Sequence, residues 1–312
     1  MKINIPRSFL WGVATSSYQV EGGIINNDWD YFTRNERIRN RISLVTKQNR
    51  FYKGVKEVTL EPAEDAVRMW EPEFYLTDFD NASALGMNAF RISIEWARIQ
   101  PERNVWNEHA IDHYKKMISS MRERNLTPIV TLNHLTLPLW ISTPPTDFKG
   151  KKIQKFMPHP IRDLPLGDPK DLDPYWKSMR GWENIETVNM FAKFVERIVT
   201  ELKDQVDYWV TINEPVATII GGGYLAGIFP PGFFLDGKRA SNAMHNLIEA
   251  HVKAYDIISS VDDMDADGDG IPKRAGFSHL MVAVKPATRK RIIDRGITNV
   301  EAARRFCYFM ND

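Results

Sequence analysis

The sequence has a single cysteine, no excess of either charge and no long apolar run, and each absence excludes a class of protein. Cys307 cannot form a disulfide within the chain, which indicates a reducing compartment such as the cytoplasm. Lys and Arg total 41 against 40 for Asp and Glu, so nothing favours nucleic acid or an anionic membrane as the partner. No stretch of about 18 apolar residues could span a bilayer, and the first residues lack the apolar segment of a signal peptide. We expect a cytoplasmic protein that binds a small neutral molecule.

The composition is that of a globular chain with a large core. Of the 312 residues, 43% are hydrophobic and 11% are Phe, Trp or Tyr, which allows one large domain or two smaller ones. Short apolar strands alternate with amphipathic helices, the pattern of a parallel α/β sheet. We expect strands over residues 9–15, 88–95, 127–133, 208–213 and 276–284. The expected helices cover residues 79–85, 108–124, 187–203, 240–259 and 300–310.

Two long segments, 33–68 and 136–181, are rich in charged residues and are expected to be irregular. Loops longer than about 15 residues inside a compact domain usually serve function or are insertions. The second segment directly follows an expected strand. We therefore expect it to lie over the functional edge of the sheet.

The most informative motif is TINEP at residues 211–215. It places an amide, Asn213, beside a carboxylate, Glu214, where Pro215 must end a strand because proline has no N–H to give to the ladder. In barrel enzymes the catalytic residues stand at strand ends. The motif therefore predicts a catalytic or binding site here.

Together with FLWGVATSSYQVEGG at 9–23 and NAFRISIEWARI at 88–99, this motif resembles glycoside hydrolase family 1, the β-glucosidase and β-glycosidase family. The resemblance implies an α/β fold, the (β/α)8 TIM barrel, and the alternation of elements accounts for about the first five of its units. It predicts a single barrel domain over residues 1–312, truncated on its C-terminal side. It also implies hydrolysis of β-linked sugars, with a small β-glycoside or oligosaccharide as substrate and no cofactor.

The resemblance assigns roles to particular side chains. It implies that Glu214 is the general acid/base of a retaining hydrolysis, and that Gln19, His134 and Asn213 bind hydroxyls of the sugar. Arg91 alternates with Phe90 and Ile92, so it is expected to point into the barrel as part of the substrate site, where a buried guanidinium needs an acidic partner.

Retention needs a second carboxyl group about 5 Å from the first, and the resemblance places this nucleophile in a TENG-like motif on a later strand. No such motif occurs in these 312 residues. Glu95 is the best internal candidate by position, but it would approach the sugar from a different direction. We expect the nucleophile to be missing, which leaves open a catalytically inactive carbohydrate-binding protein.

A separate signal is the acidic run at 262–270. Asp265, Asp267 and Asp269, with Gly270, match the first half of a calcium loop, whereas Gly276 stands where a bidentate Glu is needed. Because that ligand is missing, a polar Asp-Gly turn before the fifth expected strand is the favoured explanation of the run. A calcium-stabilised interaction module is therefore a third alternative.

Overall fold

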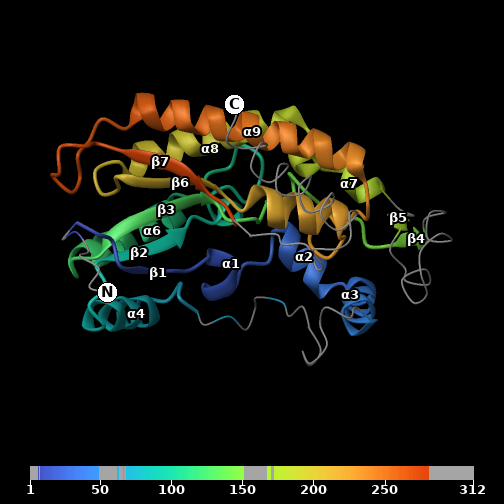
Figure 1. Ribbon diagram of the computed structural model, residues 1–312, viewed down its shortest axis with the longest axis horizontal. Coiled ribbons are helices and arrows are strands. Elements are labelled where there is room, and N and C mark those ends of the chain that lie inside the picture. The colour runs from blue at the N-terminus through green and yellow to red at the C-terminus, as the bar shows by residue number, and fades with distance from the viewer. Residues whose placement is uncertain are drawn as a thin grey trace, which may run out of the picture.

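The computed structural model describes residues 6, 8–48, 62, 66, 68–150, 167–169 and 172–280. Five parallel strands form its main sheet, and their order across the sheet follows the chain: β1 (Gly12–Ala14), β2 (Ala89–Ser93), β3 (Thr127–Asn133), β6 (Tyr208–Asn213) and β7 (Arg274–Ser278). All five carboxyl ends therefore lie along one edge of the sheet (Figure 1). This arrangement is part of an α/β barrel, as the sequence predicts.

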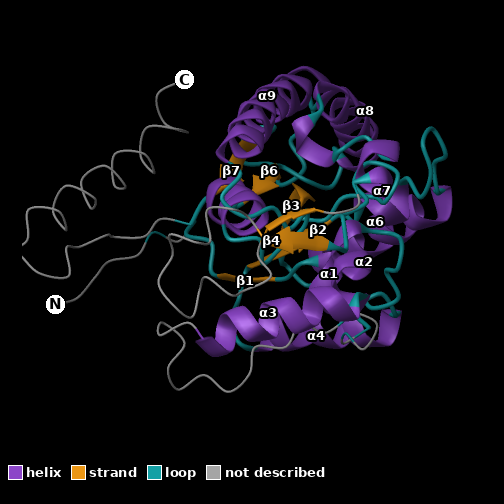
Figure 2. Cartoon of the chain, turned by 90° about the vertical axis from the view of Figure 1, so that its right-hand side faces the viewer, coloured by secondary structure: helices purple, strands orange, loops and turns teal. Residues whose placement is uncertain are grey.

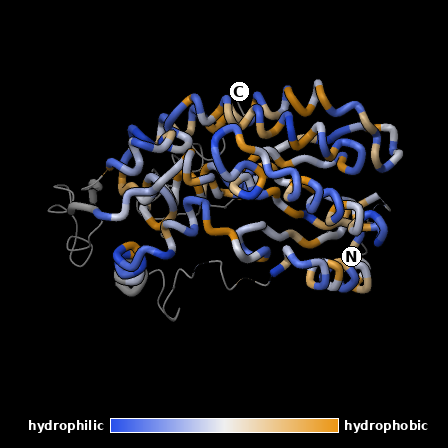
Figure 3. Tube along the Cα trace, turned by 180° about the vertical axis from the view of Figure 1, so that it is seen from behind, coloured by the Kyte–Doolittle hydropathy of each residue, from blue (hydrophilic) through white to orange (hydrophobic). Residues whose placement is uncertain are grey.

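Four long helices surround the sheet on its outer side, and they are α4 (Pro72–Ala84), α6 (Glu108–Arg122), α8 (Ile185–Leu202) and α9 (Gly237–Val261) (Figure 2). Three of them begin with a side-chain cap: Asn107, Asn184 and Asp236 each accept a hydrogen bond from a backbone N–H in the first turn. Along α8 and α9, apolar and polar residues alternate in short steps (Figure 3). Their apolar stripes pack against the sheet.

The remaining elements lie mainly in the loops that follow the strands. They are α1 (Ser17–Val20), α2 (Asp28–Arg34), α3 (Glu36–Gln48), α5 (Trp96–Ile99), β4 (Phe148–Gly150), β5 (Gly167–Pro169), α7 (Asp173–Lys177), η5 (Gly181–Glu183) and η6 (Pro215–Leu225). β4 and β5 pair with each other in an antiparallel hairpin.

The prediction of two irregular segments is wrong in part. Residues 33–68 contain α3, because Ile38 and Ile42 recur at helical spacing and bury themselves beside Phe32. Residues 136–181 contain the β4–β5 hairpin and α7. The predicted helix at 300–310 and the end of the strand predicted to reach residue 284 lie outside the described residues.

The main core fills the space between the sheet and the long helices. Phe90 of β2 meets Phe79 of α4 with ring centroids 4.9 Å apart, and Trp96 stacks on Phe194 of α8 at 5.0 Å. Because successive side chains of a strand point to opposite faces, Arg91 is directed to the inner face. None of the helices in the described part of the chain is long and apolar enough to cross a membrane.

Candidate active site

A chain of hydrogen bonds crosses the inner face of the sheet near its carboxyl edge. Arg91 of β2 donates from Nη2 to Asn213 Oδ1 over 2.8 Å, and Asn213 Nδ2 lies 3.2 Å from His134 Nε2. Arg91 also donates to the hydroxyls of Thr131, over 2.7 Å, and Ser278, over 3.4 Å. Three of the residues predicted for the substrate site therefore touch one another, although they come from three different strands and loops.

This network fixes the proton on His134. Arg91 holds the Asn213 amide with its oxygen toward the guanidinium, so the NH2 group faces His134 and Nε2 must accept. Burial and the nearby Arg91 charge lower the pKa of His134 to about 4. The imidazole is therefore neutral near pH 7 and carries its proton on Nδ1, a buried atom without a partner among the described residues.

Glu214 follows Asn213 in an unusual backbone geometry. Its φ of 46° and ψ of 52° place it in the left-handed region, which residues with a side chain rarely occupy. Its N–H donates to Ser278 O over 2.8 Å, which ties it to β7. Thr218 Oγ1 donates to Glu214 Oε2 over 2.6 Å. The backbone of Glu214 is thus tied to β7, and its half-buried carboxylate is held by Thr218.

The segment after Glu214 is the π-helix η6, a rare element that concentrates at functional sites. Its glycines permit a close contact with residues 229–231. A Cβ on Gly222 would lie 2.1 Å from the Phe229 ring, and one on Gly223 would lie 2.4 Å from Pro230 O. Larger residues at these positions would push the two segments apart and displace the loop that carries Glu214.

Gln19 stands on a separate loop at the same edge. It belongs to α1, which directly follows β1, and Ser16 Oγ donates to its Oε1 over 2.7 Å. Gln19 itself is exposed. The structure therefore places Gln19 at the carboxyl edge with the other four residues, although no described hydrogen bond joins it to them.

Three carboxyl groups lie buried beneath these loops. Glu95, predicted to end the second strand, lies two residues beyond β2 and is wholly inaccessible. Burial raises the pKa of Glu95, raises that of Asp28 well above its usual range, and raises that of Glu21 to about 7. Arg98 forms an ion pair with Glu21 at 3.0 Å. Glu95 is therefore not accessible to a sugar in this structure, and its rejection as the nucleophile stays a prediction.

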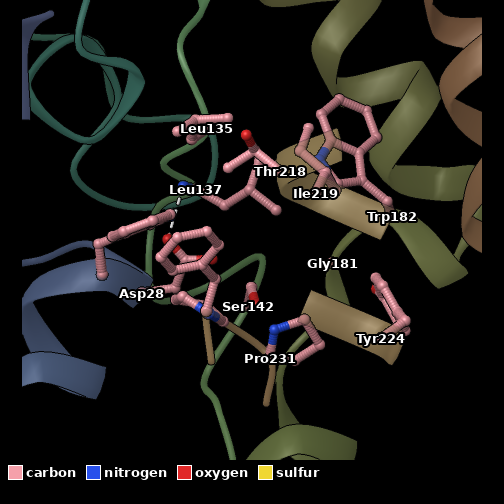
Figure 4. A pocket seen from close by; sticks show the side chains of 13 residues that line it. Asp28, Leu135, Leu137, Ser142, Gly181, Trp182, Thr218, Ile219, Tyr224 and Pro231 are labelled. Carbon is pink, nitrogen blue, oxygen red and sulfur yellow. Dashed lines mark hydrogen bonds between the residues drawn. The ribbon is translucent and has the colours of Figure 1, made fainter. Parts of the chain in front are cut away.

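A small cavity adjoins the Glu214 loop (Figure 4). It has a volume of about 20 Å³, room for about one water molecule. Among its polar lining groups are Asp28, Ser142, Trp182 and Thr218. The indole N–H of Trp182 is buried and has no partner among the described residues, and Asp28 accepts from the backbone N–H of Leu137 over 2.9 Å.

The acidic run lies at the opposite edge, before β7. Asp265 accepts from the N–H groups of Gly268 and Gly270, each over 2.9 Å, and Asp269 pairs with Arg274. Carboxylate oxygens of Asp207, Asp265 and Asp267 lie within 4.8 Å of one another, a spacing that could suit a cation. The predicted trio of Asp265, Asp267 and Asp269 is therefore not the group that converges.

The family model for glycosyl hydrolase family 1 matches residues 1–158 and 171–311. This chain belongs to that family. A β-galactosidase of Pyrococcus woesei is 30% identical over 89% of this chain and 55% of its own length. Beta-glucosidase 4 of Oryza sativa subsp. japonica is 29% identical over 81% of this chain and 43% of its own length.

Solved structures of the family show the same fold. Fpglu1 from Fervidobacterium pennivoraus superimposes with a TM-score of 0.73 at 26% identity, covering 98% of this chain and 60% of its own. A β-glycosidase of Pyrococcus horikoshii gives 0.70 at 27% identity, covering 100% of this chain and 56% of its own. The chain thus spans about half the length of the curated relatives it matches.

Sequence reasoning missed two residues that hold the candidate site. Thr218 bonds Glu214 from four residues further on, a spacing that was visible in the sequence but expected only in a regular helix. Thr136 donates a hydrogen bond to Glu95, which lies 41 residues earlier in the chain, and no local sequence pattern predicts such a contact.

Proposed function

We propose that this chain is the acid/base-bearing part of a retaining β-glycosidase. The observation that carries the proposal is the contact of Arg91, Asn213 and His134 at the carboxyl edge, directly beside Glu214. Barrel enzymes build their sites from loops at this edge. Family membership adds the chemistry, since it supplies the role of a Glu that follows Asn at the end of this strand.

In this proposal Glu214 protonates the glycosidic oxygen as the bond breaks, and then deprotonates the water that releases the sugar. Asn213 bonds the 2-hydroxyl, a contact that strengthens in the oxocarbenium-like transition state. Gln19 and His134 bind further hydroxyls, and Arg91 sets the amide orientation of Asn213. The chemistry needs two carboxyl groups and no cofactor.

In this proposal the second carboxyl group comes from outside these 312 residues. The burial of Glu95 and the donors that occupy its oxygens support its rejection as the nucleophile. One relative is named a β-galactosidase and another a β-glucosidase, and both names support a β-linked hexoside as the substrate class. The single cysteine supports a reducing compartment, for which we propose the cytoplasm.

The test is complementation. The chain alone should hydrolyse a chromogenic β-glucoside no faster than background. Joined to the C-terminal part of a relative, such as the P. woesei β-galactosidase, it should regain turnover that Glu214→Gln then lowers by about 10² to 10⁴. Glu186→Gln is the matched control, because Glu186 is an exposed carboxylate paired with Arg103.

Two results would contradict the proposal. Hydrolysis by the chain alone that disappears in Glu95→Gln would place the nucleophile on the second strand. A complemented protein that binds a β-thioglucoside without turning over β-glucosides would favour the inactive carbohydrate-binding protein instead.

A further inference from the structure

Glu95 lies at the meeting point of three loops. Its Oε2 accepts from Ser17 Oγ over 2.8 Å and from Thr136 Oγ1 over 2.9 Å, and its Oε1 accepts from Asn27 Nδ2 over 3.4 Å. These donors belong to the loops after β1 and β3 and to the residue that caps α2. A carboxylate oxygen accepts hydrogen bonds, and all three partner atoms donate to it.

On one side, Glu95 holds the loop that carries His134. Residues 133–136 turn through Leu135, whose φ of 79° lies in the left-handed region. Such a conformation costs free energy and persists only where the surroundings enforce it. Asn133 Nδ2 donates to Thr136 O over 3.0 Å, and the Thr136 hydroxyl donates to Glu95. The turn that presents His134 is therefore closed onto Glu95.

On the other side, Glu95 holds the helix that carries Gln19. Ser17 is the first residue of α1, and its N–H donates to Ser93 Oγ over 2.7 Å while its hydroxyl donates to Glu95. Gln19 lies two residues further along the same short helix. A helix of four residues has little stability of its own, so these anchors determine where it sits.

We propose that Glu95 is a positioning residue that sets the placement of Gln19 and His134 relative to each other, through Ser17 and Thr136. It does not touch the sugar. This inference rests on the proposed function, in which both side chains bind one glycone. Because one carboxylate oxygen accepts from both hydroxyls, it anchors the two loops to a common point.

The experiment compares Glu95→Gln and Thr136→Val in the full chain with Asp262→Asn as the matched control. Glutamine at position 95 cannot accept all three hydrogen bonds. Its NH2 group would face either the Asn27 donor or the hydroxyls of Ser17 and Thr136, and a donor facing a donor forms no bond. Thr136→Val keeps the side-chain shape and removes one hydroxyl. Asp262 is equally buried and accepts from Trp209 Nε1 over 2.8 Å, but it lies at the opposite edge of the sheet.

Backbone hydrogen exchange is measured alongside the affinity for a β-thioglucoside. In Glu95→Gln, we expect faster exchange over both 15–20 and 133–137, unchanged exchange over 215–225, and an affinity about tenfold weaker. Thr136→Val should loosen 133–137 and weaken binding by a smaller factor. Asp262→Asn should lower the thermal midpoint but change neither the exchange in these two loops nor the affinity.

Unchanged exchange in either loop of Glu95→Gln overturns the positioning role, and so does exchange that rises in both loops while the affinity stays the same. If both loops loosen but the parent chain itself binds no β-thioglucoside, the proposed function fails while the link between the loops is upheld. Should Glu95→Gln not fold, Thr136→Val alone tests the positioning role. It must loosen residues 133–137 and not 15–20, and it must still weaken the binding of the β-thioglucoside.

Discussion

The two edges of the main sheet both gather acidic side chains, and they use them in opposite ways. At the amino edge, the bonds of Asp265 reach only three to five residues along the chain and close a local turn. At the carboxyl edge, the bond from Arg91 to Asn213 spans 122 residues, and that from Ser17 to Glu95 spans 78. The acidic turn closes largely on itself, with Asp207 as a link to the strand before it, whereas the contacts at the carboxyl edge form only once the strands have come together.

The difference supports the carboxyl edge as the candidate functional edge. Acidic groups that bond neighbouring backbone N–H groups are already satisfied by the turn they form. Side chains that bond one another across strands and loops fix a constellation that no local structure requires. Such a constellation is what binding and catalysis need.

The test with the largest expected effect replaces one arginine at each edge by leucine. Arg91→Leu leaves oxygens of Asn213 and Thr131 without their donor, so we expect the free energy of unfolding to fall by about 3 kcal/mol and the affinity for a β-thioglucoside by about 100-fold. Arg274→Leu removes a half-exposed pair with Asp269 and should cost less than about 1 kcal/mol, with unchanged affinity. Denaturant unfolding and calorimetry measure both. Equal losses in the two variants would remove the distinction between the edges.

The edges should also respond differently to pH. Burial raises the pKa of Glu21 to about 7 from 4.5, so the folded protein holds a proton there that the unfolded chain releases. Stability should therefore fall as pH rises from about 4.5 to about 7, and the raised pKa values of Asp28 and Glu95 act in the same direction. Glu21→Gln should flatten this dependence by an amount of order 3 kcal/mol.

The matched control is Asp263→Asn at the amino edge. The hydrogen bond from Lys203 lowers the pKa of Asp263, so its contribution is lost only in more acidic solution, as pH falls through the folded-state pKa. The variant should leave the slope between pH 4.5 and 7 unchanged. A parent protein whose stability rises over this interval would refute the assignment of a proton to Glu21.

A smaller effect is expected at Asp207. Its two oxygens accept from the N–H groups of Ala266, over 2.8 Å, and Asp267, over 2.7 Å, and it is almost fully buried. Asp207→Ala should lower the free energy of unfolding by about 2 kcal/mol and leave sugar affinity unchanged, because the turn it closes lies away from the candidate site. A loss of affinity as large as that of Arg91→Leu would show that the edges are coupled.

The smallest effect concerns calcium. The oxygens of Asp265 already accept backbone N–H groups, and Asp269 is engaged by Arg274. Addition of about 1 mM calcium should raise the thermal midpoint by less than about 1 °C. A rise of several degrees that Asp265→Asn abolishes would show that the acidic turn is a metal site after all.

Local patterns predicted the frame of the molecule well. The sequence predicted the strand at 208–213 with its observed bounds, and the helix at 108–124 ends two residues late. The strand is an apolar run with a clear stop at Pro215, and the helix has an apolar stripe that ends at the turn after Arg122. The first strand was predicted over 9–15, but only Gly12–Ala14 pairs, because hydrogen bonding to β2 and not hydropathy sets its length.

The candidate site was predictable only as separate residues. Arg91, His134, Asn213 and Glu214 could be named from strand ends and a family motif, but their contacts depend on the order of strands in the sheet. Neither the π-helix after Glu214 nor the place of Glu95 beneath the loops follows from local sequence. The apolar run of the second strand predicts a strand that reaches Glu95. The true partners of this residue, Ser17, Asn27 and Thr136, are distant along the chain and leave no local signal.

The left-handed backbone at Glu214 has a consequence for how this sequence can change. Glycine occupies that conformation at no steric cost, whereas a residue with a side chain pays about 1–2 kcal/mol. Replacement of Glu214 by glycine would relieve that local cost, and it would remove the acid/base carboxylate that the proposed chemistry requires. At this position a local gain in backbone free energy is therefore set against the proposed turnover.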